Sequence, residues 1–213
     1  MLYNFFRFIE KSDTAFLKSK NNKLILNIVG NKISSFTHIE LELDDIRGQI
    51  DTPLCITHEK LSIINKLSPK NPIIIYMQKN KIYLFTKTDK INIKWNLCQD
   101  DDEDNLEEPP QIDYKFGFIA PVGSLSNIAK MDNKIVFEIK NNKIKLKCGS
   151  LSVAIKEKCE EKFIIEFNTK DIINFLKNLP QRDNVKIYIK ERYPLKMCYK
   201  NDYMKAECYF SCI

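Results

Sequence analysis

The chain has 213 residues, of which 44% are hydrophobic, and a formal net charge of +6 at pH 7. That length suits two domains of about 100 residues each, and no apolar run approaches the ~20 residues of a membrane-spanning helix. Residues 100–108 hold seven acids and no base, so the rest of the chain carries a charge of +13. Such a surplus favours binding to polyanions, although the abundance of Lys, Asn and Ile equally fits an AT-rich genome.

Two patterns bear on the cellular compartment. Residues 1–10 have no basic lead, no uninterrupted apolar run and no small-residue cleavage site, so we expect no secretion signal there. The seven cysteines are an odd number and include no Cys-x-x-Cys pair, which favours reduced thiols that pack as small apolar residues. We therefore expect an intracellular protein without a membrane span.

The first half of the chain predicts two units, each a short amphipathic helix followed by two apolar strands. The first unit has its helix at residues 2–11 and its strands near residues 15–17 and 24–29. The second unit spans residues 57–87 and is similar to residues 169–199. An offset of 112 residues aligns Thr57 with Thr169, Leu67 with Leu179, Ile75 with Ile187 and Tyr76 with Tyr188. This internal similarity predicts two related domains.

A connector is predicted in the middle of the chain. Residues 90–98 and 112–120 alternate apolar and polar side chains, which indicates half-buried antiparallel strands. Between them, the acidic run and the pair Pro109-Pro110 can continue neither a helix nor a central strand. We expect an N-terminal domain at residues 1–98, an acidic connector at 99–112 and a C-terminal domain at 113–213.

The second half of the chain predicts the same succession of elements. One helix is expected at residues 123–131, and another begins at Thr169 as its N-cap and is ended by Pro180. Further strands are predicted at residues 38–43, 135–139, 144–148, 151–155, 163–167, 185–189, 195–199 and 206–210. Antiparallel strands with few, short helices define an α+β fold: two similar domains of antiparallel sheets with short amphipathic helices on one face.

The predicted helices carry basic residues opposite their apolar stripes. At about 100° per residue, the helix beginning at Thr169 separates Ile172, Ile173, Leu176 and Leu179 from Lys170, Asn174, Lys177 and Gln181. The preceding helix separates Leu125, Ile128 and Ala129 from Ser126 and Lys130. A single basic face is ordinary on a solvated helix. Repeated units with such faces favour contact with a polyanion and suggest a scaffold that encircles DNA.

Sequence motifs for catalysis are absent. The chain has no Gly-x-x-x-x-Gly-Lys loop, no His-Glu-x-x-His and no Gly-x-Ser-x-Gly, and it holds only five glycines and two histidines. The acids at residues 100–104 lie on a run that lacks the preorganisation a metal or catalytic site requires. We expect no enzyme activity, no cofactor and no metal site.

Three stretches, taken in order, carry a family resemblance. They are residues 118–130; the junction formed by Leu97, the acidic run, Leu106, Pro109-Pro110 and residues 112–116; and Tyr-Pro-Leu-Lys-Met-Cys-Tyr-Lys at 193–200, followed by Met204 and Tyr209-Phe210. They resemble the start of the second domain, the interdomain connector and the C-terminal strand pair of the eukaryotic-type DNA sliding clamps, the proliferating cell nuclear antigens and their viral relatives. With the repeated units, the resemblance covers nearly the whole chain.

The resemblance implies a ring, usually a homotrimer, whose basic helix faces line a central hole around double-stranded DNA. Mobile Lys and Arg side chains would contact phosphates in a salt-sensitive, sequence-independent way that permits sliding. The candidate DNA-binding residues are Arg7, Lys11, Lys66, Lys130, Lys170 and Lys177.

The resemblance also implies protein partners: a clamp loader, DNA polymerase and other proteins that insert an aromatic and aliphatic plug into a pocket beside the connector. By position, this pocket would be formed by Val29, Lys32, Ile33, Leu106, Pro109, Pro194, Tyr209 and Phe210. Subunits would meet by edge-strand pairing of residues 90–98 with residues 151–158 of a neighbour. The expected location is the nucleus or a viral replication site.

The chain departs from the family pattern in three places. Its first predicted helix begins almost at Met1, where the family has an opening strand; its connector is unusually acidic; and Ser211-Cys212-Ile213 lacks the family's Ala-Pro. Three alternatives stay open: a clamp-fold protein that acts as a monomer or dimer, a subunit of a heteromeric checkpoint-type clamp, and a transcription or scaffold factor that does not encircle DNA.

Overall fold

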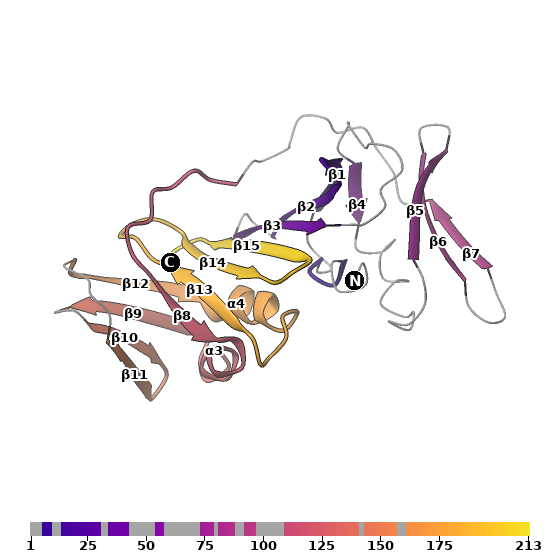
Figure 1. The fold of residues 1–213 in the computed structure, drawn as a ribbon. Helices are drawn as coiled ribbons and strands as arrows, with labels where there is room; N and C mark the ends of the chain where they lie inside the picture. The colour runs from indigo at the N-terminus through magenta and orange to yellow at the C-terminus, as the bar shows by residue number, and fades with distance from the viewer. Residues whose placement is uncertain are drawn as a thin grey trace. The chain divides into compact units, whose positions relative to one another are not determined.

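The structure is a computed structural model of the 213-residue chain. It describes residues 6–9, 14–30, 34–42, 54–57, 73–78, 81–87, 92–96, 109–140, 143–156 and 161–213. The chain divides into two compact units (Figure 1): unit 1 comprises Met1–Asn31 and His38–Glu108, and unit 2 comprises Lys32–Thr37 and Pro109–Ile213. All strand pairs with a described register are antiparallel.

The elements of unit 1 whose bounds are described are strands. They are β1 (Thr14–Lys20), β2 (Lys23–Val29), β4 (Leu54–Thr57), β5 (Ile73–Gln78), β6 (Lys81–Lys87), β7 (Asn92–Asn96) and, from His38 onward, β3 (Ser35–Glu42). One sheet has the order β4-β1-β2-β3 and the other the order β5-β6-β7. Asn21 and Asn22 join β1 to β2 with positive φ angles of 52° and 60°, which Asn tolerates better than most residues.

The described residues of unit 2 form two sheets and two helices. Its elements are β8 (Gly117–Pro121), α3 (Val122–Ala129), β9 (Lys134–Lys140), β10 (Lys143–Cys148), β11 (Leu151–Lys156), β12 (Phe163–Asn168), α4 (Thr169–Leu176), β13 (Asn184–Tyr188), β14 (Leu195–Lys200) and β15 (Met204–Phe210). The sheets have the orders β15-β14-β13-β8 and β11-β10-β9-β12. The first residues of β3 also belong to unit 2, where Thr37 Oγ1 lies 3.1 Å from Cys208 Sγ.

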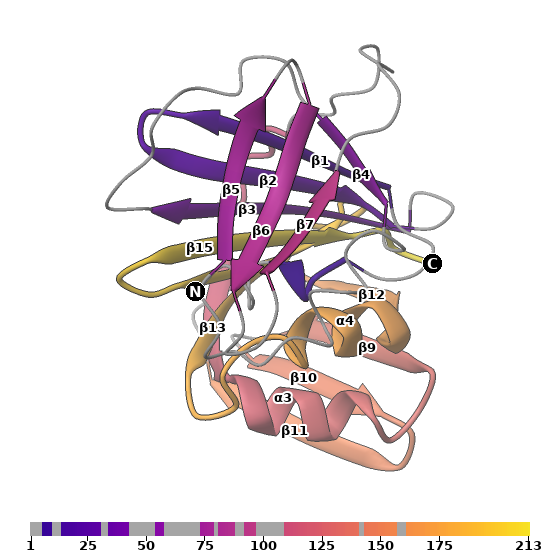
Figure 2. The ribbon, with the colours of Figure 1, turned by 90° about the vertical axis from the view of Figure 1, so that its right-hand side faces the viewer.

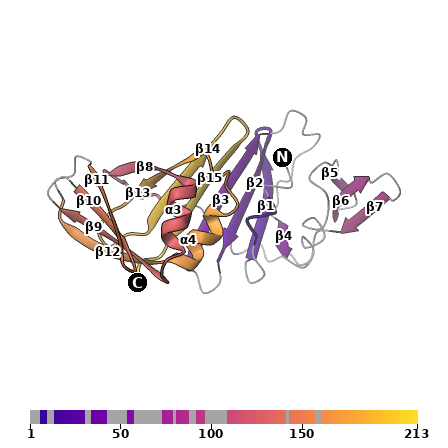
Figure 3. The same ribbon diagram turned by 90° about the horizontal axis from the view of Figure 1, so that it is seen from below.

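Aromatic side chains join the two sheets and the helices of unit 2 in one core. Phe137 on β9 contacts Phe118 on β8 and Phe167 on β12, with ring centroids 6.3 and 6.0 Å apart. Phe175 on α4 meets Phe210 on β15 in an edge-to-face pair at 6.1 Å. The two helices contact each other and lie side by side, as Figures 2 and 3 show. Each helix is therefore buried on one side and exposed on the other.

The structure confirms the α+β fold and the predicted order of helix, strand, strand for α3 and α4. The alternation of apolar and polar residues predicted β9 and β10 correctly. The alternate apolar residues of these strands are buried: Ile135, Phe137, Ile139, Ile144, Leu146 and Cys148. Of the predicted helix at residues 2–11, only residues 6–9 are described, and the predicted helix after Thr57 lies outside the described residues.

Four details of the sequence prediction are wrong. Asn168, and not Thr169, is the N-cap of α4, and the helix ends at Leu176, before Pro180. Residues 112–116 form no strand, since β8 begins only at Gly117, and the Tyr114 hydroxyl in this segment donates a hydrogen bond to Pro194 O at 2.7 Å. Ser126, predicted on the solvent side of α3, is only 1% exposed.

Candidate nucleic-acid and partner interface

The exposed side of α4 carries two of the predicted lysines. Lys170 and Lys177 are exposed, whereas Ile172 and Leu176 are fully buried. Lys177 Nζ donates a hydrogen bond to Asn174 Oδ1 at 3.2 Å. The amide of Asn174 thus helps to hold the Lys177 ammonium group on the outward side of the helix.

The exposed side of α3 continues this surface. Lys130 directly follows the helix and is exposed, as are Ser124 and Asn127, while Leu125 and Ala129 are buried. Because the two helices contact each other, these side chains form a surface that we call the helix-pair face: Ser124, Asn127, Lys130, Lys170, Asn174 and Lys177. Within the sequences of α3 and α4, the acidic residue is Asp171, which is half-buried in the first turn of α4.

The remaining predicted DNA-binding residues belong to unit 1. Arg7 is exposed, and Lys11 and Lys66 lie outside the described residues. Arg182, in the loop between α4 and β13, is also exposed, and helical spacing could not indicate it because it lies beyond Pro180.

The predicted partner-binding residues are split between the units. In unit 2, Pro194 and Pro109 are half-buried, and Tyr209 and Phe210 are only 4% and 2% exposed. Phe210 contributes to the core through Phe175, so its side chain supports the sheet from within. In unit 1, Val29 at the end of β2 is half-buried. Lys32, Ile33 and Leu106 lie outside the described residues.

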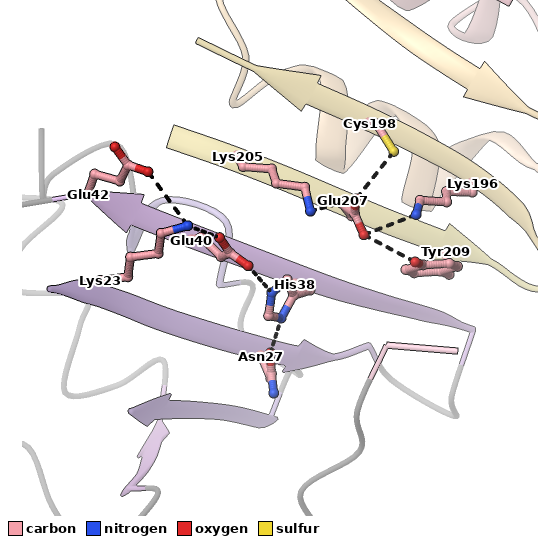
Figure 4. A network of polar contacts seen from close by, with 10 residues as sticks. All are labelled: Lys23, Asn27, His38, Glu40, Glu42, Lys196, Cys198, Lys205, Glu207 and Tyr209. Carbon is pink, nitrogen blue, oxygen red and sulfur yellow. Dashed lines mark hydrogen bonds and ion pairs between the residues drawn. The ribbon is translucent and has the colours of Figure 1, made fainter. Parts of the chain in front are cut away.

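A buried carboxylate holds the hydroxyl end of Tyr209. Glu207 is 9% exposed and accepts from Lys196 Nζ at 3.1 Å, from Lys205 Nζ at 3.0 Å and from the Tyr209 hydroxyl at 3.2 Å (Figure 4). Burial works to raise the pKa of the Glu207 carboxyl, but the hydrogen bonds from Lys205 and Lys196 outweigh it and lower that pKa. Burial and the negative charge of Glu207 raise the pKa of the Cys198 thiol to about 12, so Cys198 stays protonated.

Unit 1 has a separate polar cluster on β2 and β3. Lys23 Nζ lies 2.8 Å from Glu40 Oε2 and 3.6 Å from Glu42 Oε1. The His38 ring lies between Asn27 Oδ1, 2.7 Å from Nδ1, and Glu40 Oε1, 3.3 Å from Nε2 (Figure 4). Each ring nitrogen of His38 thus lies beside an oxygen that can accept a hydrogen bond. The cluster ties adjacent strands together and includes none of the predicted binding residues.

The two strands predicted to join subunits are both terminal strands of their sheets. β7 ends the order β5-β6-β7 in unit 1, and β11 ends the order β11-β10-β9-β12 in unit 2. Within the described strands, each has one hydrogen-bonded neighbour, β6 for β7 and β10 for β11. Each strand therefore keeps one edge on which another strand can pair.

The part of the chain that the structure describes brings together no group of three or more His, Cys, Asp or Glu side chains that could hold a metal ion. No described helix has the length and apolar character needed to cross a membrane.

Comparison with solved structures identifies the fold. The chain superimposes on the proliferating cellular nuclear antigen of Entamoeba histolytica with a TM-score of 0.81 at 18% identity, covering 100% of this chain and 94% of that one. The fold is that of the proliferating cell nuclear antigens. No protein-family model and no curated protein matches the sequence.

Two archaeal structures show the same PCNA fold. The PCNA2–PCNA3 complex of Sulfolobus tokodaii matches with a TM-score of 0.79 at 13% identity, over 99% of this chain and 95% of that one. PCNA of Thermococcus kodakaraensis matches with the same score and identity, over 100% and 96%. The PCNA fold therefore accounts for the full length of this chain, while the residues that fill it have diverged widely.

Proposed function

We propose that this protein is a DNA sliding clamp, a processivity factor that encircles duplex DNA and tethers DNA polymerase and other replication and repair proteins. The observation that carries the proposal is the helix-pair face. Three lysines, Lys130, Lys170 and Lys177, lie exposed on two adjacent helices of a chain with the PCNA fold. No enzyme activity is part of this proposal.

The helix-pair face has the chemistry that sliding needs. Lysine ammonium groups on flexible stems attract phosphates without reading bases, so no register on the DNA is preferred. The neighbouring Ser124, Asn127 and Asn174 side chains add neutral hydrogen-bonding groups. Attraction of this kind weakens steeply with salt, and a closed ring would keep the protein on DNA after the electrostatic contacts loosen.

The free edges of β7 and β11 support assembly into a homotrimer. Pairing of β7 from one copy with β11 from the next would join their sheets across each subunit boundary and leave neither edge exposed. β11 reads Leu-Ser-Val-Ala-Ile-Lys, so five of its six side chains are uncharged and suit such an interface.

Partner proteins would dock beside Pro194 and Tyr209. Pro194 is fixed by the hydrogen bond from Tyr114, and Tyr209 by Glu207 and by the ring of Phe36, whose centroid lies 6.3 Å away. In this proposal Glu207 is a positioning residue, because it holds the hydroxyl end of Tyr209, whose almost fully buried ring would support a docked apolar plug from beneath. In unit 2, half-buried Pro109 would add to this partner surface, and Phe210 would support it from within the core.

The test begins with assembly. Light scattering after size-exclusion chromatography should give about three times 25.1 kDa, at two salt levels and several concentrations. Retention should then be compared on circular and on linear duplex DNA in high salt. A topologically closed clamp stays on circles and slides off linear ends, whereas a protein held by charge alone leaves both equally and would contradict the proposal.

A heteromeric clamp is the second candidate. The similar Sulfolobus tokodaii structure is a complex of two different chains, PCNA2 and PCNA3. A chain that stays monomeric alone but forms a ring of trimeric mass with a different clamp-fold chain would favour this candidate over the homotrimer.

A further inference from the structure

A second group of lysines lies on the strands of unit 2, away from the helices. In the register of β9 and β10, Lys143 stands opposite Lys140, and Lys145 stands opposite Glu138. Residues directly opposite each other project from the same face of a sheet. The alternate residues, including Phe137 and Leu146, are buried in the core, so the lysines face outward.

This face has more positive than negative charge. Its acid on β9 and β10 is Glu138, whose carboxylate pairs with Lys147 Nζ at 2.7 Å. Lys140, Lys143 and Lys145 are exposed and form no ion pair within 4 Å among the described residues, while the charges of Lys145 and Lys140 help Lys147 to lower the pKa of Glu138. We call these three residues the sheet lysine cluster.

The pairing of Lys140 with Lys143 is unfavourable in the isolated protein. Side chains directly opposite on antiparallel strands have Cβ atoms about 5 Å apart, and like charges there destabilise the pairing. Lys143 stands opposite Lys140 in the register of β9 and β10. A bound polyanion would remove this repulsion, because each ammonium group would then face a phosphate.

The character of the surface indicates which polyanion it fits. Successive outward residues on β10 lie about 6.7 Å apart, and the lysines span two strands, so they form a flat patch of separated charges. No aromatic side chain projects from the outward positions of β9 and β10, which are Lys134, Val136, Glu138, Lys140, Lys143, Lys145 and Lys147. Single-stranded nucleic acid is typically bound with base stacking on aromatic rings, whereas duplex DNA offers only its phosphates to a flat basic surface.

We propose that the sheet lysine cluster is a second binding site for the phosphate backbone of duplex DNA, separate from the helix-pair face. The site requires neither a ring nor a trimer, because its three lysines come from adjacent strands of one unit. It would let the protein hold a DNA segment on its sheet surface in addition to one at its helices.

The test measures binding to a short linear duplex of mixed sequence between about 50 and 200 mM salt, using fluorescence anisotropy. The triple variant Lys140→Gln/Lys143→Gln/Lys145→Gln should make the slope of log affinity against log salt shallower by about 2 to 3, since each lost phosphate contact removes roughly 0.9. Its thermal unfolding midpoint should not fall, because the substitution relieves repulsion between Lys140 and Lys143.

Two control variants define the outcomes. The first is Lys186→Gln/Lys190→Gln/Lys200→Gln, which removes the same charge elsewhere in unit 2. The proposal would be overturned if this control changed the salt slope as much as the sheet variant does, or if the sheet variant left the slope unchanged. It would also be overturned if the sheet variant lost binding to polyglutamate, used as a second polyanion, but kept its binding to duplex DNA. The second is Lys130→Gln/Lys170→Gln/Lys177→Gln on the helix-pair face. If this variant alone binds normally, the sliding-clamp proposal fails while the sheet site stands.

Discussion

α3 and α4 are eight-residue helices of the same unit, but their N-termini are held in different ways. α4 begins after Asn168, whose side chain accepts a hydrogen bond from Lys170 N at 2.9 Å. α3 begins after Pro121, which provides no side-chain cap. Its first amides, of Val122 and Gly123, donate instead to Asp183 O at 2.9 Å and Gln181 O at 3.0 Å. One helix is capped locally and the other by a distant loop.

The difference shows that the two lysine-bearing helices depend on each other unequally. Helices this short are marginal in isolation, so both need tertiary contacts. The loop that caps α3 is the segment that follows α4, and its position is set where α4 ends. A change that moves α4 should therefore disturb α3 as well, while a change at the start of α3 should leave the Asn168 cap intact.

The largest effect is expected from removing the anchor of α4. Phe175 is 4% exposed and packs edge-to-face on Phe210, so Phe175→Ala should cost about 3–5 kcal/mol of unfolding free energy. Urea denaturation measures this cost, and hydrogen exchange at Val122 and Gly123 reports whether the α3 cap opens too. The half-buried neighbour Ile173→Ala is the control and should lose less. Normal protection at Val122 in Phe175→Ala would contradict the dependence of α3 on α4.

A smaller effect is expected from crowding the cap of α3. A Cβ atom on Gly123 would lie 2.8 Å from Gln181 O, closer than packed atoms tolerate. Gly123→Ala should therefore cost about 1–3 kcal/mol, since the helix or the loop must shift. Ser124→Ala, one residue later on the exposed side, should stay within about 0.5 kcal/mol in the same thermal unfolding assay. Equal stability of both variants would mean that the loop yields without cost.

The caps themselves provide a matched pair of variants. Asn168→Ala removes the acceptor for Lys170 N and should cost about 1 kcal/mol, whereas Asn168→Asp keeps an acceptor and should not. Pro121→Ala removes no side-chain hydrogen bond and should cost less than Asn168→Ala in chemical denaturation. A larger loss for Pro121→Ala would show that the fixed backbone of proline matters more to α3 than the contrast with α4 implies.

The sequence predicts structure that depends on neighbouring residues better than it predicts contacts between distant segments. Alternation predicted the strands of unit 2, and period-3.6 spacing placed both described helices within a few residues. The cap of α4 was misplaced by one residue, because Asn168 and Thr169 are both good caps and only the structure shows that the Thr169 hydroxyl donates to Asp132 O at 2.6 Å. The α3 cap depends on a loop distant in sequence, and no local pattern indicated it.

Some residues of the candidate site were likewise predictable from the sequence and others were not. Helical spacing predicted Lys130, Lys170 and Lys177 on exposed surfaces, and these lysines are exposed. The Glu207 network and the sheet lysine cluster were not predicted, because both follow from strand register, which sequence alternation does not determine. Phe175 was also missed, since the apolar stripe was drawn through Ile173, which is half-buried, while Phe175 is buried.

The smallest effect on stability is expected from substituting the lysines of the helix-pair face. Lys130→Gln and Lys177→Gln should each leave the unfolding free energy within about 0.5 kcal/mol, because both side chains are exposed. Each should make the salt dependence of duplex binding shallower by about one phosphate contact if both helices face DNA. Asn174→Ala, which removes the acceptor for Lys177 Nζ, serves as the control for positioning and should keep the salt slope. A change with Lys177→Gln alone would mean that only α4 faces DNA, and α3 would then serve to hold its neighbour in place.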